Sequence, residues 1–156
     1  MGVQANGEII VDLDRAAVFA FVSDPVRLAQ CIPGCSDLRE IAPGRYAAQL
    51  TSRVAYIAVK FKVIAEIVKM EPPSAIEVKL TGDAIGLAGR LVAGAAIELA
   101  DAGERTAIRY SAEVTLSGKL GGLGQPVFRA KSAELAQEFA ANLKAALERK
   151  PGEVPA

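Results

Sequence analysis

The stretch from Asp37 to Ser117 is a run of strand-like segments separated by short turn sequences. An alternation with a period of two places one apolar face on each strand. It predicts strands over 37–42, 45–56, 58–70, 76–81, 87–100 and 105–117. Pro-Gly, Pro-Pro and Asp-Ala-Gly-Glu sequences mark turns within this stretch. Successive strands joined by turns this short favour an antiparallel meander.

Helical patterns precede and follow these strands. Residues 7–13 alternate like a further strand, and Asp14 is a suitable N-cap for a helix over 15–22. Pro25 suits the first position of a second short helix, over 26–30. After Pro126 an apolar stripe predicts a long C-terminal helix. The residues of this stripe are Val127, Leu135, Phe139, Leu143 and Leu147.

The predicted fold class follows from this order of elements. It is an α+β, helix-grip fold, in which a curved antiparallel sheet of about seven strands wraps around the long C-terminal helix, with two short helices after the first strand. A chain of 156 residues is long enough for one domain with a single core. We expect this domain over residues 1–149 and a short tail over 150–156.

Composition restricts the classes of function. The 18 basic and 18 acidic side chains balance, so nucleic-acid binding is disfavoured because it depends on phosphate neutralisation. The sequence contains no His, which excludes a Ser-His-Asp triad and a His-based zinc site. We find neither a secretory leader nor an apolar segment long enough to span a bilayer, and we expect a cytoplasmic protein.

Alternation also predicts which side chains face the helix across the sheet. Many of these positions hold alanine, so the space is either closed by a near approach of the helix or left open as an apolar ligand cavity. Periodicity alone does not decide between these two possibilities. The predicted cavity lining is Leu50, Val54, Phe61, Val63, Leu91, Ala93, Ala95, Tyr110, Ala112, Val114, Leu123, Val127, Leu135 and Phe139.

Two segments are expected at the opening of such a cavity. One is the Pro-Gly turn between the two cysteines, and the other is the apolar, glycine-rich loop over 82–89. The alternative for the loop is that it folds back onto the core. The predicted rim residues are Cys31, Pro33, Gly34, Cys35, Ile85 and Leu87.

We predict no catalytic and no metal-binding residues. Cys31 and Cys35 lack the C-x-x-C spacing, and a metal would lack ligands without His or a third Cys. We interpret both as small buried apolar residues, the alternatives being a strained disulfide or a reactive thiol. Tyr110 points inward and either bonds to the backbone or offers its hydroxyl to a ligand. Three carboxylates point away from the cavity by alternation, namely Glu66, Glu98 and Glu113.

Several segments together resemble one known family. Gly7-Glu8, Phe21-Val22-Ser23-Asp24-Pro25 and Cys31-Ile32-Pro33-Gly34-Cys35 resemble the G-subunit family of carbon monoxide dehydrogenase. Further matches are Phe61, Val63 and residues 106–110 and 118–124. The resemblance extends from about residue 7 to residue 147, and it implies the helix-grip fold of the START-like (SRPBCC) superfamily. Other branches of that superfamily share the fold but not the Ile-Pro-Gly-Cys segment.

The resemblance implies a non-catalytic accessory protein of a molybdenum hydroxylase of the carbon monoxide dehydrogenase type. Members of the family are thought to recruit that enzyme to the inner face of the membrane and to bind an apolar ligand such as a quinone. We therefore expect the hydroxylase subunits as partners, a quinone or lipid in the cavity, a peripheral membrane contact, and no covalent or metal cofactor.

Two functions of other classes remain open. An enzyme of the cyclase or aromatase kind, which the same superfamily contains, would need polar groups that converge on the cavity, above all a buried carboxylate. A docking protein without a ligand would instead use the 82–89 loop and the Pro-Gly turn as its interface.

Overall fold

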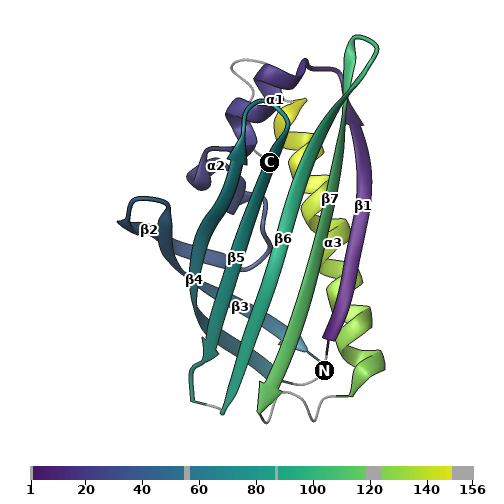
Figure 1. Cartoon of the computed structure of the whole chain (residues 1–156). Helices are drawn as coiled ribbons and strands as arrows, with labels where there is room; N and C mark the ends of the chain where they lie inside the picture. The colour runs from purple at the N-terminus through teal and green to yellow at the C-terminus, as the bar shows by residue number, and fades with distance from the viewer. Residues whose placement is uncertain (1, 55–56, 87, 119–123, 149–156) are drawn as a thin grey trace.

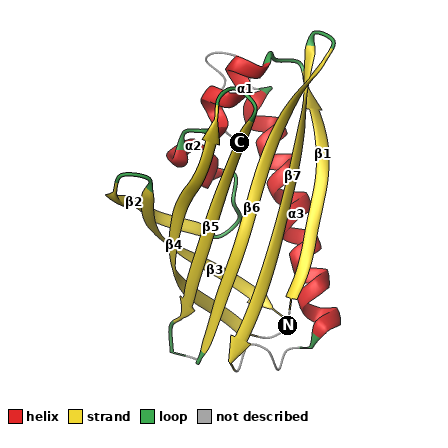
Figure 2. Cartoon of the chain, in the orientation of Figure 1, coloured by secondary structure: helices red, strands yellow, loops and turns green. Residues whose placement is uncertain are grey.

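The computed structural model describes residues 2–54, 57–86, 88–118 and 124–148. Within this part of the chain the order of elements and the α+β class are the predicted ones (Figures 1 and 2). The elements are β1 (Gly2–Val11), α1 (Arg15–Val22), α2 (Pro25–Gln30), β2 (Cys35–Ala42), β3 (Arg45–Val54), β4 (Ile57–Glu71), β5 (Ala75–Ala84), β6 (Gly89–Ala102), β7 (Arg105–Gly118) and α3 (Gln125–Leu147).

All seven strands form one antiparallel sheet in the order β1-β7-β6-β5-β4-β3-β2. Strands β2 to β7 follow one another as the predicted meander, whereas β1 pairs with β7 at the opposite edge. Helices α1 and α2 therefore lie between the two edge strands in the sequence. The sheet is strongly curved, because β2 and β3 cross behind the middle strands in Figure 1, and α3 lies on the same, concave side.

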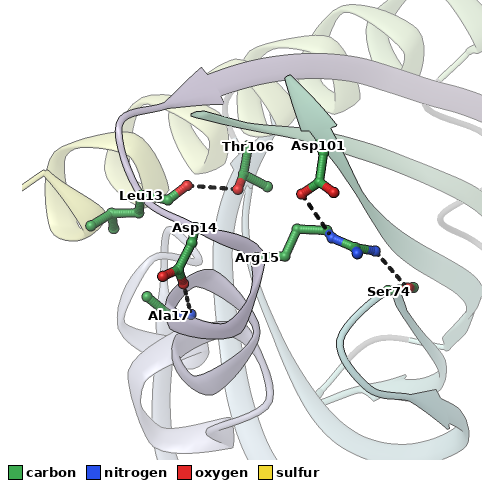
Figure 3. A network of polar contacts seen from close by, with 7 residues as sticks. All are labelled: Leu13, Asp14, Arg15, Ala17, Ser74, Asp101 and Thr106. Carbon is green, nitrogen blue, oxygen red and sulfur yellow. Dashed lines mark hydrogen bonds and ion pairs between the residues drawn. The ribbon is translucent and has the colours of Figure 1, made fainter. Parts of the chain in front are cut away.

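Both short helices begin as predicted. Asp14 Oδ1 accepts a hydrogen bond from Ala17 N at 2.7 Å (Figure 3), and Asp24 Oδ1 accepts one from Val26 N at 3.0 Å. Pro25 takes the first position of α2, where its missing N–H has no helical partner to lose. Local sequence is therefore sufficient to place the start of each of these helices.

Polar contacts fix the start of α1 to the turns at one end of the sheet (Figure 3). Thr106 Oγ1 donates a hydrogen bond to the backbone oxygen of Leu13 at 2.6 Å, and Thr106 is fully buried. Arg15 Nε lies 3.0 Å from Asp101 Oδ1, and its Nη1 lies 3.2 Å from Ser74 Oγ. Ser74 lies in the turn between β4 and β5, whereas Asp101 and Thr106 flank the turn between β6 and β7. The contacts therefore hold the start of α1 against both hairpins.

Buried apolar residues form two clusters at opposite ends of the concave face. We call them the upper and the lower core, after their places in Figure 1. The upper core packs α1 and the last turns of α3 on the sheet, with Val11, Val18, Phe19, Val22, Cys31, Ile76, Ile97, Leu99, Ile108, Leu143 and Leu147. The lower core lies at the first turn of α3, with Val3, Val59, Phe61, Val63, Leu116 and Phe128.

Strand bounds differ from the predictions at both ends of β1, at the end of β5, at the start of β2, which begins at Cys35, and at both ends of β6, which spans Gly89–Ala102. β1 begins at Gly2 rather than at residue 7, because its first residues pair with β7, where Gly2 lies opposite Thr115. It ends at Val11 rather than at residue 13. β5 continues into the predicted 82–89 loop, since Ala84 still pairs with Phe61 of β4. Residues 55, 56 and 87, which were predicted in strands, lie outside the described residues. None of the described helices has the length and hydropathy of a membrane span.

Candidate functional site

Small side chains line the concave face of the sheet between the two cores. Ala5 of β1 lies opposite Ala112 of β7, which lies opposite Ala95 of β6. We call these three the alanine row. They share a face with Val3 and Val11, which are almost fully buried, yet each alanine is only half-buried. The described side chains therefore leave the row partly accessible, as expected at the wall of an apolar ligand site.

The inward stripe of α3 runs across both cores. Phe128 belongs to the lower core and Leu143 to the upper core, whereas Leu135 and Phe139 between them are half-buried. The prediction for Val127 is wrong, because this side chain is exposed. A helix turns by about 100° per residue, so residue 128 and Leu135, which are seven residues apart, lie on the same face of α3. Residue 127 points about 100° away from that face. Phe128 was missed for the same reason.

The other residues of the predicted cavity lining are distributed over the two cores and the space between them. Those in or against the lower core are Leu50, Phe61, Val63, Leu91 and Val114. Those packed against the upper core are Tyr110 and Phe139. Ala93 is buried, and Ala95, Ala112 and Leu135 are half-buried. Leu123 and the side chain of Val54 lie outside the described residues.

Tyr110 takes the inward direction that alternation predicts. Its ring meets the ring of Phe139 edge-on, with centroids 6.0 Å apart and an interplanar angle of 78°. The ring also lies over Gly7, its partner on β1. The hydroxyl makes no hydrogen bond with a described residue, so it remains available as a donor or an acceptor beside the alanine row.

Ser52 contributes an unpaired hydroxyl next to the lower core. It follows Leu50 on the same face of β3, and it lies opposite Val59, which is 3% exposed. Its Oγ is buried and has no hydrogen-bond partner among the described residues. A buried hydroxyl without a partner costs about 1–3 kcal/mol by protein mutational data. Sequence reasoning missed Ser52, because only tertiary burial distinguishes it from any other strand serine.

The predicted rim residues take different positions. The prediction for Cys31 is wrong, since Cys31 is only 3% exposed and packs inside the upper core. Its backbone oxygen accepts a hydrogen bond from Asn142 Nδ2 of α3 at 3.0 Å. Pro33 and Cys35 are half-buried, and Gly34 is exposed. At the other predicted rim segment Ile85 is exposed, and Leu87 lies outside the described residues.

The Pro-Gly turn is fastened to the sheet through Gly34. This residue has a φ of +81°, and its backbone oxygen accepts a hydrogen bond from Thr51 N at 3.0 Å. A Cβ at position 34 would overlap the backbone oxygen of Thr51. The turn therefore requires glycine for two reasons, the left-handed conformation and the close approach of β3.

Neither cysteine forms a disulfide with a described residue, and burial raises the pKa of the Cys35 thiol. A raised pKa keeps the thiol protonated and poorly nucleophilic near neutral pH. The interpretation as a buried apolar residue is confirmed for Cys31 by its place in the upper core, but it is wrong for Cys35, which is only half-buried. The described residues contain no group of His, Cys, Asp and Glu side chains that could hold a metal ion.

Two open depressions lie along the β1–β7 pair, and most of their lining side chains point to the convex face. One has a volume of about 460 Å³ and is lined by Asn6, Gly7, Glu8, Glu98, Arg109, Tyr110 and Ser111. The other has a volume of about 530 Å³ and is lined by Gly2, Val3, Gln4, Glu113, Val114, Thr115 and Arg129. The outward direction of Glu98 and Glu113, like that of Glu66, agrees with the prediction, since all three are exposed.

The lining of the first depression contains one ion pair, and Glu98 adds a second carboxylate. Arg109 Nε lies 2.7 Å from Glu8 Oε2, and this hydrogen bond raises the already high pKa of Arg109. Of the predicted cavity residues only Tyr110 reaches this depression, and only Val114 reaches the second one. Neither depression therefore corresponds to the apolar space between sheet and helix.

Comparisons with known proteins agree with this architecture. The family model described as the G subunit of carbon monoxide dehydrogenase (CoxG) matches residues 7–148. A conserved protein from Geobacillus kaustophilus of known crystal structure is 25% identical, with a TM-score of 0.82 over 93% of this chain and 95% of that one. No relative is detected among curated protein sequences.

Two more distant structures share the fold. A START superfamily protein from Mycobacterium smegmatis is 14% identical, with a TM-score of 0.71 over 93% of this chain and 97% of that one. The Zhui aromatase/cyclase from Streptomyces sp. R1128 is 13% identical, with a TM-score of 0.69 over 99% of this chain and 100% of that one. At these identities the likeness concerns the START-like fold and not the activity.

Proposed function

This chain belongs to the CoxG family of carbon monoxide dehydrogenase, and we propose that it is a non-catalytic accessory protein of a molybdenum hydroxylase of that type. In this proposal it binds an apolar, quinone- or lipid-like molecule between the sheet and α3. It also helps to bring the enzyme to the inner face of the cell membrane. The family match over residues 7–148 supports the accessory role and the choice of partner.

The observation that carries the ligand-binding part is the accessible alanine row. Ala5, Ala112 and Ala95 form a continuous small-residue strip on the concave face, where α3 also lies, between two buried apolar clusters. A flat ring or an apolar chain placed against this strip would bury surface that the described side chains leave exposed. Ser52 Oγ and the Tyr110 hydroxyl are both free to donate a hydrogen bond to an oxygen of such a ligand.

The ligand-binding part is tested by thermal unfolding with menaquinone and ubiquinone analogues. A ligand that binds only the folded state stabilises it by about 2.7 kcal/mol at a hundred times its Kd, so the melting temperature should rise. Ala95→Phe fills the alanine row and should abolish this rise. Ala96→Phe places the same bulk on the convex face of β6 and should preserve it, each variant being compared with its own ligand-free form.

The accessory part is tested by co-purification with the molybdenum hydroxylase. If the hydroxylase is retained while no apolar ligand raises the melting temperature, the protein is a docking factor without a ligand. If neither occurs, the proposed function is wrong. The catalytic alternative of the cyclase kind has no supporting observation here, since every Asp and Glu among the described residues is at least partly exposed.

A further inference from the structure

Basic side chains concentrate at one end of the molecule. We define this lower end as the described residues of 51–62, 82–91, 116–118 and 124–131, where β3, β5 and β7 end and β4, β6 and α3 begin (Figure 1). It carries one acidic side chain, Asp83, against the six basic side chains of Arg53, Lys60, Lys62, Arg90, Arg129 and Lys131. The whole chain has 18 of each sign, so the lower end is a distinctly positive pole.

Most of this positive charge is not neutralised within the molecule. Arg90 Nη1 lies 3.3 Å from Asp83, and Lys131 Nζ lies 3.6 Å from Glu134. The remaining four cations are exposed and form no ion pair with any described residue, namely Arg53, Lys60, Lys62 and Arg129. Near the opposite end, Arg15, Arg105 and Arg109 each have a carboxylate partner. The lower end therefore presents charge that an external anionic surface can neutralise.

Exposed apolar side chains accompany these cations. Ile85 is 45% exposed, and its backbone N–H donates a hydrogen bond to the backbone oxygen of Lys60 at 2.8 Å, so the two residues are adjacent. Val127 is 39% exposed and precedes Arg129 by two residues on the first turn of α3. Unpaired cations beside isolated exposed apolar side chains suit an anionic bilayer, where the charges meet lipid phosphates and the apolar groups enter the headgroup boundary.

We propose that the lower end is a docking surface for anionic phospholipid bilayers. Arg53, Lys60, Lys62 and Arg129 contact lipid phosphate groups, and Ile85 and Val127 enter the interface. This inference rests on the proposed role at the membrane and names the surface that carries it. An acidic protein would use the cations equally, but it would need an apolar pocket opposite each of the two isolated side chains, whereas a bilayer accepts apolar groups at any position.

The test is co-sedimentation with vesicles of phosphatidylcholine alone and of phosphatidylcholine with an equal part of phosphatidylglycerol. The natural chain should bind only the anionic vesicles, and high salt should weaken this binding because it screens exposed charges. Each basic residue near such a surface contributes about fivefold in affinity, the equivalent of about 1 kcal/mol. The triple variant Arg53→Gln, Lys60→Gln and Arg129→Gln should therefore bind about a hundredfold more weakly.

The matched control is the triple variant Arg39→Gln, Lys79→Gln and Lys144→Gln. These cations are also exposed and without an ion pair to a described residue, but they lie outside the lower end, so the loss of net charge is the same. The affinity of this control variant for anionic vesicles should differ from that of the natural chain by no more than a few-fold. Equal losses in the two triple variants would overturn the proposed surface, since net charge alone would then explain binding. Unchanged melting temperatures verify that both variants fold.

Two further outcomes separate the alternatives. Ile85→Ser with Val127→Ser should weaken vesicle binding several-fold and make the residual binding more sensitive to salt. Binding to immobilised polyglutamate but not to anionic vesicles would overturn the bilayer as the partner in favour of an acidic protein. If no vesicle binds while quinone analogues still raise the melting temperature, the membrane inference fails and the ligand-binding proposal stands.

Discussion

The ring of Tyr110 lies across Gly7, so close that a side chain at residue 7 would overlap its hydroxyl oxygen. The two residues face each other on β7 and β1, and Phe139 of α3 contacts the ring edge-on. Glycine at this edge of the sheet therefore lets the ring lie along β1 beneath the helix. The Tyr110 hydroxyl can lie beside the alanine row only because residue 7 has no Cβ.

Gly7→Ala should destabilise the fold by about 1–3 kcal/mol, because the added methyl group displaces the Tyr110 ring from its place against Phe139. Urea unfolding measures the change. The control is Gly94→Ala on β6, where a Cβ would meet no atom within 4 Å. Alanine there should be neutral or stabilising by up to about 1 kcal/mol. Similar effects at the two positions would contradict the packing of Tyr110 on Gly7.

Gly34→Ala should cost more stability than Gly44→Ala, although both residues have a positive φ, of +81° and +73°. A left-handed alanine costs about 1–2 kcal/mol at either site. Only at residue 34 does the new Cβ also overlap a backbone atom, the oxygen of Thr51, whereas residue 44 has open space. Chemical denaturation should give a difference of about 1 kcal/mol or more between the variants. Equal losses would show that the turn moves freely away from β3.

Ser52→Ala should raise the free energy of unfolding by about 1 kcal/mol, since it removes a buried hydroxyl that has no hydrogen-bond partner among the described residues. The same variant should weaken binding of an oxygen-bearing quinone analogue about fivefold, because the ligand loses a hydrogen-bond donor. Ser111→Ala, at an exposed position on the convex face, should change neither quantity. A loss of stability in Ser52→Ala would mean that the hydroxyl has a partner in the folded protein.

Alkylation by iodoacetamide should be slow at Cys35 near neutral pH and should accelerate in alkaline solution, because burial raises the pKa of its thiol. The folded pKa lies above the unfolded value, so the native state holds this proton more strongly. The resulting stability is fully present below the unfolded pKa and is lost as the pH rises through the folded pKa. Cys35→Ser should reduce that alkaline loss. Cys31, inside the upper core, should react only on unfolding.

Much of the fold follows from local sequence. Asp14 and Pro25 mark the starts of α1 and α2, and strand alternation identifies Tyr110 and Ala112 as inward residues. The beginning of β1 was missed, although Val3 and Ala5 alternate with Gln4 and Asn6 in the residues from Gly2 to Asn6. They become a strand only by pairing with β7.

The candidate site was only partly predictable. Ala95 and Ala112 were expected at the concave face from alternation, but nothing in the sequence shows that Ala5 completes their row. Cys31 was misplaced at a rim, because a thiol beside a turn gives no local indication that the upper core surrounds it. Val127 was assigned to the inward stripe of α3 in place of Phe128, because the helical period alone does not fix which residue points inward at the end of a long helix.

Periodicity and short motifs are sufficient to predict the order of the elements, their inward faces and the family, because each depends on residues close together in the chain. Which distant residues meet depends on the tertiary structure. It placed Gly7 against Tyr110 and left the Ser52 hydroxyl without a hydrogen-bond partner in the part of the chain that the structure describes. It also gathered Lys60 and Arg129 at one end of the molecule. Such contacts join residues far apart in the chain, and they exist only once strand register and helix packing are established.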